Sequence, residues 1–192
     1  ASDVYKRQTQ IRIGGLGGQG VIMAGMIVGK AASIFDDKQA AMIQSFGPEA
    51  RGSACSAQVT IDDAFIGYPY VDELDILVTL SQEAYLLFAP HLASDGILVY
   101  ESELVDPVDL PPTTEKYGIP ATRFAEQMRR KMVLNIVMVG FLTAVTDVCS
   151  QEAMQKAVEA SVPRGTERLN LAAFFRGYSH GLEVTGRPSL MP

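Results

Sequence analysis

The sequence predicts an α/β fold with a mixed, mainly parallel sheet, helices on both faces and a helical C-terminal third. Three observations carry this prediction. A short β-branched run stops at a glycine-rich loop that leads into an apolar helix, which is the order of a Rossmann-like first βα unit. Two continuous apolar runs flank a helical segment, as in a β-α-β unit, and only helical patterns follow residue 121.

The first half of the chain is expected to contain three strands and one long helix. Residues 10–13 and 40–43 are short strand-like runs, and the nearly uninterrupted apolar residues of 21–35 predict a buried helix between them. In 55–61, apolar and polar side chains alternate, which is typical of a half-exposed strand at an antiparallel or edge position. A turn after this strand would lead into 65–67 and form a short hairpin.

The second half is expected to extend the sheet and then to become helical. Residues 75–80 and 97–100 are continuous apolar runs, as strands covered on both faces would be, and 82–92 forms the helix between them. Ser150 has the position of an N-cap, and Gly177 has the position of a helix-ending glycine. The remaining helices are expected at 121–128, 132–148, 151–160 and 167–176.

Length and charge exclude several classes of protein. The chain has 192 residues and a formal net charge of −6, so a basic nucleic-acid-binding face is not expected. This length suits a single domain, expected at 10–182, with a disordered tail or cloning remnant at 1–9 and a second tail at 183–192. The longest apolar run, 132–145, is interrupted by polar residues and is shorter than the roughly 20 residues that cross a bilayer. Neither a nucleic-acid nor a membrane partner is expected.

The cysteines and histidines do not form a catalytic or metal-binding set. Cys55 and Cys149 are far apart, so this chain alone cannot build a zinc ribbon, a Cys-ligated iron–sulfur cluster or a disulfide framework. Cys55 is expected to be a buried, unreactive thiol, and His91 and His180 are isolated. Asn135, in an otherwise apolar helix, is expected to bond to a helix cap or to a partner's backbone. No catalytic residue and no metal ligand are predicted, and a reducing, cytoplasmic location is expected.

The best candidate site is the loop Gly15-Leu16-Gly17-Gly18-Gln19-Gly20, hereafter the glycine loop. It matches the G-x-G-x-x-G fingerprint, in which the backbone approaches a phosphate at a helix N-terminus. The acid that would hold a dinucleotide ribose is missing, because the second strand runs into Ser45-Phe46, and no Gly-Lys-Ser/Thr follows as in a P-loop. Two interpretations stay open: a turn that only lets the helix pack on the sheet, or a site for a phosphate of another ligand. The candidate contacts are Gly15, Gly17, Gly18, Gln19 and Gly20.

A second candidate segment, residues 45–53, follows the second strand and combines two glycines and a proline with Glu49 and Arg51. In a doubly wound fold this position is the carboxyl edge of the sheet, so the segment could face the glycine loop. Ser45 and Arg51 are then candidate contacts, because a guanidinium can clamp a phosphate or a carboxylate. The alternative is that Arg51 pairs with Glu49 or with another acid at a subunit interface.

Three segments together resemble the gamma subunits of 2-oxoacid:ferredoxin oxidoreductases, which also occur as one domain of single-chain pyruvate:ferredoxin oxidoreductases. They are residues 15–21, 45–53 and 135–140, with the sequences GLGGQGV, SFGPEARGS and NIVMVG. The second segment is the specific one. The resemblance covers about residues 11–177, and its spacing and length are most similar to the stand-alone gamma subunit of 2-oxoglutarate:ferredoxin oxidoreductases.

The resemblance implies a multisubunit enzyme that decarboxylates a 2-oxoacid on thiamine diphosphate, passes electrons through iron–sulfur clusters to ferredoxin, and transfers the acyl group to coenzyme A. In this family thiamine diphosphate belongs to the alpha and beta subunits, and the clusters belong to cysteine-bearing subunits. This chain would therefore hold no cofactor alone and would be inactive alone. Its partners would be the alpha and beta subunits and ferredoxin, and the presence of a ferredoxin-like delta subunit stays open.

The same resemblance gives the glycine loop and Arg51 a ligand, because coenzyme A carries phosphates and these are the phosphate-compatible features of the chain. Part of residues 45–53 would also lie in an exposed surface that partner subunits cover. Two alternatives stay open. The chain could be an independent nucleotide- or coenzyme A-binding α/β protein, or a purely structural subunit whose glycine loop makes protein contacts only.

Overall fold

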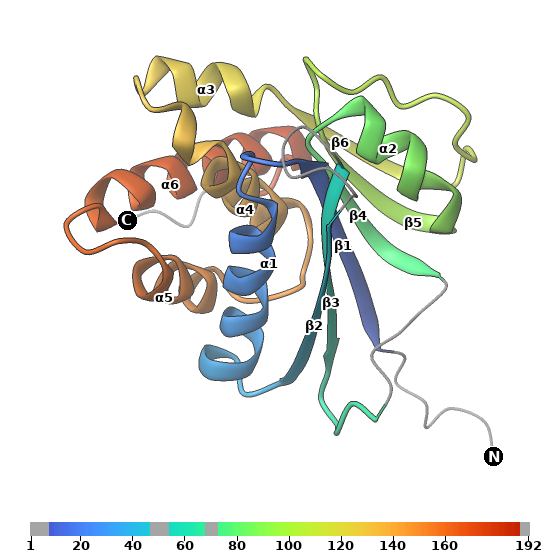
Figure 1. Ribbon diagram of the computed structural model, residues 1–192, viewed down its shortest axis with the longest axis horizontal. Coiled ribbons are helices and arrows are strands. Elements are labelled where there is room, and N and C mark those ends of the chain that lie inside the picture. The colour runs from blue at the N-terminus through green and yellow to red at the C-terminus, as the bar shows by residue number, and fades with distance from the viewer. Residues whose placement is uncertain (1–7, 47–53, 68–72, 189–192) are drawn as a thin grey trace.

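The computed structural model describes residues 8–46, 54–67 and 73–188 of the chain, and its centre is a six-stranded sheet (Figure 1). The strand order across the sheet is β2-β3-β1-β4-β5-β6. The strands are β1 (Thr9–Leu16), β2 (Gln39–Phe46), β3 (Ala54–Asp62), β4 (Leu74–Thr79), β5 (Leu92–Glu101) and β6 (Glu115–Ile119).

The sheet is mixed and mainly parallel, as the sequence predicts. Strand β1 pairs in parallel with β4, and β4, β5 and β6 continue in parallel. Strand β3 lies antiparallel to both of its neighbours, β1 and β2. Because β3 is reversed relative to both, β2 runs in the same direction as β1, and the described sheet contains one reversed strand.

Helices cover both faces of the sheet, which confirms the predicted layers (Figure 1). Helices α1, α4, α5 and α6 lie on one side, and α2 lies on the other. The α-helices are α1 (Val21–Lys30), α2 (Gln82–Phe88), α3 (Ala121–Gln127), α4 (Leu134–Val145), α5 (Gln151–Ser161) and α6 (Glu167–Thr185). A π-helical turn (Ala31–Phe35) continues α1, and 3-10 turns follow α2 (Ala89–His91) and precede α4 (Lys131–Val133). The C-terminal third is helical, as predicted, and Ser150 is the N-cap of α5, where its Oγ accepts from Ala153 N at 3.1 Å.

The closest helix packing joins α4 to α6. Every residue of α4 from Asn135 to Val145 is buried. A Cβ added at Gly140 would lie 1.9 Å from Phe174 O, and one added at Gly177 would lie 1.9 Å from Val137 O. The backbone of each helix therefore fills the place of a side chain in the other.

This packing corrects the expected role of Gly177. The sequence predicts that this glycine ends the last helix after residue 176, but α6 continues through it to Thr185 and ends at Gly186, which has a φ of 66°. Gly177 is present because it faces α4, not because it terminates a helix.

The predicted half-exposure of 55–61 is wrong, although its antiparallel pairing is confirmed. Ser56, Gln58 and Thr60 on the polar face of β3 are 3%, 5% and 1% exposed. Strand β1 supplies polar partners for two of them, because Arg12 donates to Gln58 and Thr60 donates to the Gln10 amide oxygen at 2.7 Å. The polar face of β3 is therefore buried instead of facing water, and hydrogen bonds to β1 satisfy part of its polar groups.

One further strand expectation needs correction, and one strand was missed. Residues 65–67 form no strand, so the expected hairpin after β3 is wrong, and Phe65 in this segment is 86% exposed. Strand β6 was not predicted, because its sequence EKYGI shows neither an apolar run nor a regular alternation. The domain limits of 10–182 remain a prediction.

We expect Gly177→Ala to lower the free energy of unfolding by at least about 1–3 kcal/mol, because the added methyl group meets a backbone carbonyl that cannot rotate away. Gly29→Ala is the matched control, since Gly29 is also helical but has no atom within 4 Å of an added Cβ. The control should be neutral or should stabilise α1 by up to about 1 kcal/mol. Urea denaturation measures both, and equal stability of the two variants would contradict the close packing of α4 on α6.

Candidate functional site

The glycine loop lies at the edge of the sheet where the parallel strands end. One row of paired residues crosses five strands near that edge and consists of Ser45, Ser56, Gly14, Thr79 and Tyr100. The glycine loop follows directly after this row on β1, and the next helix begins beside it (Figure 1). In open α/β sheets, ligands bind at this carboxyl edge.

Strand β2 ends and strand β3 begins at the same edge of the sheet. Phe46 at the end of β2 pairs with Cys55, and Ala54 at the start of β3 pairs with Leu16 of the glycine loop. Since β3 separates β1 from β2, the ends of those two strands are about 10 Å apart. Ser45 is thus brought to the candidate edge, whereas Arg51 lies outside the described residues and its placement remains a prediction.

The side chain of Gln19 holds the glycine loop in place. Its Oε1 accepts from Leu16 N at 2.7 Å, and its Nε2 donates to Leu80 O at 3.0 Å. A backbone hydrogen bond from Gln19 N to Leu16 O closes the same turn at 3.1 Å. Gln19 therefore ties the loop after β1 to the residue that follows β4, which is a structural role that leaves less of its amide for a ligand.

The glycines of the loop divide into two groups. A Cβ at Gly15 would lie 2.7 Å from Gln19 Oε1, and one at Gly20, where φ is 74°, would lie 2.4 Å from the Asn135 amide nitrogen. These two glycines are required by internal packing. Gly17 and Gly18 are exposed, and an added Cβ at Gly18 would meet no atom within 4 Å. The surface that a ligand could approach therefore consists of the two middle glycines.

The N-terminus of α1 has features that suit an anion or another polar ligand. Gly20 is the N-cap, so no side chain caps the first N–H groups of the helix, and the first turn contains no acidic residue. Asn135, which is 3% exposed, donates from Nδ2 to Gly20 O at 3.2 Å. Its Oδ1 is buried and has no hydrogen-bond partner among the described residues. An uncapped helix N-terminus and an unpaired acceptor thus meet at one place.

Asn135 is the residue of this site that sequence reasoning did not assign to it. The pattern shows one amide in an apolar helix and indicates that it must be satisfied at a helix cap or on a partner. The structure shows that half of this expectation holds, because Nδ2 bonds to the N-cap residue of α1, 115 positions earlier in the chain. A polar residue in an otherwise apolar helix was the available signal, but the sequence does not show which loop it meets.

The cysteines and histidines do not take part in this site. Cys55 and Cys149 are 8% and 6% exposed, and burial raises the pKa of both thiols, that of Cys149 to about 12 with Asp36 adding to the shift. His91 ends a 3-10 turn, and His180 packs against the rings of Phe124 and Phe141. The described part of the chain contains no group of three or more His, Cys, Asp or Glu side chains that could hold a metal ion.

Comparison with known proteins places the whole fold in one family. Residues 10–180 match the family model described as pyruvate ferredoxin/flavodoxin oxidoreductase. The chain belongs to this family. A solved structure, the gamma subunit of a keto/oxoacid ferredoxin oxidoreductase from Geobacter sulfurreducens, superposes with a TM-score of 0.82 at 37% identity, and the match covers 92% of this chain and 98% of that one.

Two relatives from one organism, Methanocaldococcus jannaschii, differ in their similarity to this member of the pyruvate ferredoxin/flavodoxin oxidoreductase family. The 2-oxoglutarate synthase subunit KorC is 44% identical over 93% of this chain and 97% of its own length. The pyruvate synthase subunit PorC is 34% identical over 78% of this chain and 83% of its own length. No helix within the described residues is both long and apolar enough to cross a membrane.

We expect Gln19→Ala to destabilise this family member by about 1–3 kcal/mol, because Leu16 N and Leu80 O both lose the partner that the amide supplies. Gln127→Ala is the control, since Gln127 is exposed in the last turn of α3. Chemical denaturation followed by circular dichroism measures the difference. A Gln19→Ala variant as stable as the control would show that the loop does not depend on this side chain.

Proposed function

We propose that this chain is the gamma subunit of a 2-oxoglutarate:ferredoxin oxidoreductase. The observation that carries the proposal is the difference between the two relatives from one organism, since identity and coverage are both higher for the 2-oxoglutarate synthase subunit than for the pyruvate synthase subunit. The family match over residues 10–180 and the similarity to a solved gamma subunit support the same role.

In this proposal the assembled enzyme oxidatively decarboxylates 2-oxoglutarate in the cytoplasm and yields acyl-coenzyme A, carbon dioxide and reduced ferredoxin. The iron–sulfur clusters belong to the partner subunits, because the two cysteines of this chain are too few to ligate a cluster and are both buried. Thiamine diphosphate is assigned to the partner subunits as the family resemblance implies. The gamma subunit contributes binding surface to an active site that it does not build alone.

The glycine loop is the proposed contact of this subunit with coenzyme A. The exposed backbone at Gly17 and Gly18 and the uncapped N-terminus of α1 suit a phosphate of that molecule. Ser45 lies at the same edge, and Arg51 is proposed to pair with a phosphate. Bound coenzyme A would supply the thiol that accepts the acyl group.

One observation favours a purely structural subunit as a second candidate. Packing alone explains Gly15 and Gly20, since an added Cβ at either position would meet a side chain of this chain. Two of the fingerprint glycines would therefore be required even if the loop contacted only protein. The φ of 92° at Gly18 also favours glycine whatever the loop contacts, whereas the exposed Gly17 has no positive φ and is not explained in this way.

Reconstitution of the complex tests the subunit role. We expect the purified chain to show no 2-oxoacid-dependent viologen reduction, and activity to appear when it is co-expressed with alpha and beta subunits. The complex should turn over 2-oxoglutarate in preference to pyruvate. Turnover by the chain alone would contradict the subunit role, and a preference for pyruvate would contradict the substrate.

The variant Arg51→Ala in the assembled enzyme separates ligand binding from assembly. If Arg51 pairs with a phosphate of coenzyme A, loss of a charge-assisted contact of roughly 1.5–3 kcal/mol should raise the KM for coenzyme A about tenfold to a hundredfold, with unchanged yield of complex. Arg164→Ala, an exposed arginine between α5 and α6, is the control. Poor assembly with a normal KM would instead establish the structural role.

A further inference from the structure

Positive charge is concentrated in one turn of this acidic molecule. Residues 121–133 carry four basic side chains and one acidic one, a formal charge of +3 in a chain whose total is −6. Three of the basic side chains are consecutive in the turn between α3 and α4, which is Met128-Arg129-Arg130-Lys131-Met132, hereafter the basic turn. Since the remainder of the chain carries −9, a negatively charged surface is attracted to this turn and repelled by the rest.

The two arginines of the basic turn are not neutralised by the chain itself. Arg129 and Arg130 are exposed and form no ion pair or side-chain hydrogen bond with any described residue. Lys131 pairs only with Glu126, at 3.3 Å between Nζ and Oε1, and both of these side chains are exposed. An exposed pair of this kind contributes little, so all three cations are available to a partner.

The backbone of the basic turn is closed by two hydrogen bonds. Arg129 N donates to Glu126 O at 2.8 Å and Arg130 N donates to Ala125 O at 3.1 Å, which is the pattern of a Schellman C-cap. Arg129 occupies the left-handed position of this motif, with a φ of 55°, where glycine is usual because it has no Cβ. An arginine at a position that favours glycine indicates that its side chain has a use outside the turn. The closed turn also holds both arginines in place before a partner arrives, which lowers the ordering cost of binding.

An exposed apolar side chain indicates what kind of anionic partner fits. Met132 is 92% exposed, the highest value among the large apolar side chains of the described residues, and it follows the three cations directly. A phosphate gains nothing from contact with a thioether, whereas protein interfaces are enriched in both methionine and arginine. The basic turn therefore suits a protein surface that presents carboxylates around an apolar contact.

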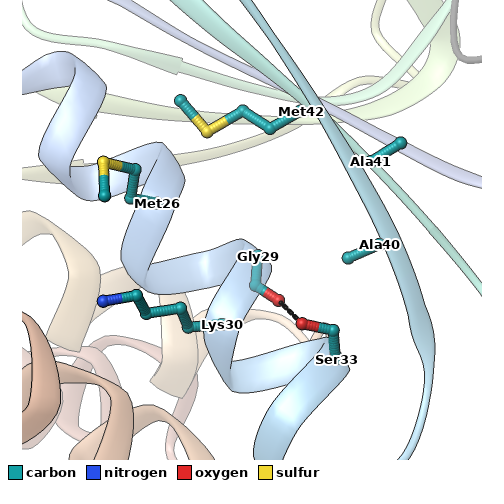
Figure 2. Close-up of a pocket in the computed structure, with 7 residues that line it drawn as sticks. All are labelled: Met26, Gly29, Lys30, Ser33, Ala40, Ala41 and Met42. Carbon is teal, nitrogen blue, oxygen red and sulfur yellow. Dashed lines mark hydrogen bonds between the residues drawn. The ribbon is translucent and has the colours of Figure 1, made fainter.

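The hollow between α1 and β2 has no such selectivity. It has a volume of about 250 Å³, with Met26 and Met42 on its two sides (Figure 2). Its ionisable side chain, Lys30, donates from Nζ to Ser161 Oγ of α5 at 3.2 Å. This hollow favours no charge on an occupant, so the basic turn is the better guide to a partner.

The basic turn lies at the same end of the molecule as the glycine loop. Asn135, four residues after Lys131, donates from Nδ2 to Gly20 O at 3.2 Å, so the start of α4 connects the two (Figure 1). We propose that the basic turn docks on an acidic surface of a partner subunit, which covers Met132. This inference rests on the proposed subunit role. The docked subunit then lies beside the glycine loop and borders the candidate ligand site.

Charge reversal in the co-expressed complex tests the docking. Arg129→Glu/Arg130→Glu should lower the amount of this chain that co-purifies with tagged alpha and beta subunits at least about tenfold in about 50 mM salt, because attraction becomes repulsion. The difference from wild type should shrink in about 500 mM salt, where charges are screened. Arg164→Glu/Arg168→Glu is the matched control, since both of these arginines are exposed outside the basic turn and the change in net charge is the same.

The variant Arg129→Gly separates docking from folding. Glycine suits the φ of 55° at this position, so the chain should be at least as stable as wild type in urea denaturation while its co-purification falls. A double charge-reversal variant that assembles as well as the control would overturn the docking. Normal assembly with a raised KM for coenzyme A would also overturn it, because the turn would then serve a ligand. If the wild-type chain itself does not co-purify with alpha and beta subunits, the subunit role fails and this inference fails with it.

Carbodiimide cross-linking of the assembled complex identifies the acidic surface. The reagent joins an amine to a carboxylate in contact with it, so Lys131 should couple to an Asp or Glu of a partner subunit. Arg130→Lys keeps the charge and should add a second coupling site on the same subunit. Mass spectrometry of the digested complex detects both products. Coupling of Lys131 to Glu126 alone, in a complex that is fully assembled, would overturn the proposal.

Discussion

The approach of the α4 backbone to the α6 backbone is the contact on which the rest of the molecule depends. Gly140 and Gly177 let each helix occupy the space of a side chain in the other. Helix α4 is thereby fixed as a fully buried element between α6 and the first helix, and its start is held against the start of α1. A helix this apolar could slide along its neighbours, since apolar surfaces alone do not specify a register, but two backbone contacts that lie three residues apart on each helix do.

This register determines the geometry of the candidate site. Because α4 cannot shift, Asn135 meets Gly20, and only a residue without a Cβ fits there. The same position requires a left-handed backbone, so packing and conformation select glycine independently. The N-terminus of α1 consequently has no side-chain cap, and the unpaired Oδ1 of Asn135 lies beside it. The features that make this edge suitable for a ligand follow from helix packing in the C-terminal third.

Periodicity in the sequence was sufficient to predict the layers of sheet and helices, but not the polar contacts between neighbouring strands. Apolar runs identify β4 and β5, and the glycine loop identifies the first strand and helix, because those signals are local. The buried polar face of β3 could not be recognised, since its partners Gln10 and Arg12 are 50 and 46 residues away in the sequence. Gly177 was misassigned for the same reason: its role depends on Val137 and not on its own helix.

The candidate site was likewise predictable from the sequence only in part. The fingerprint located the loop at the correct edge, and the strand register brings Ser45 to that edge. The pattern left the same two roles open for all of its glycines, whereas the structure separates Gly15 and Gly20, which fill packed positions, from Gly17 and Gly18, which are exposed. A family fingerprint can therefore persist for two reasons at once. The packed glycines preserve the shape of the loop whatever it contacts, and the φ of 92° at Gly18 favours glycine in the same way. Gly17 is exposed and has no positive φ, so it is the loop glycine whose substitution best discriminates between a ligand and a partner subunit.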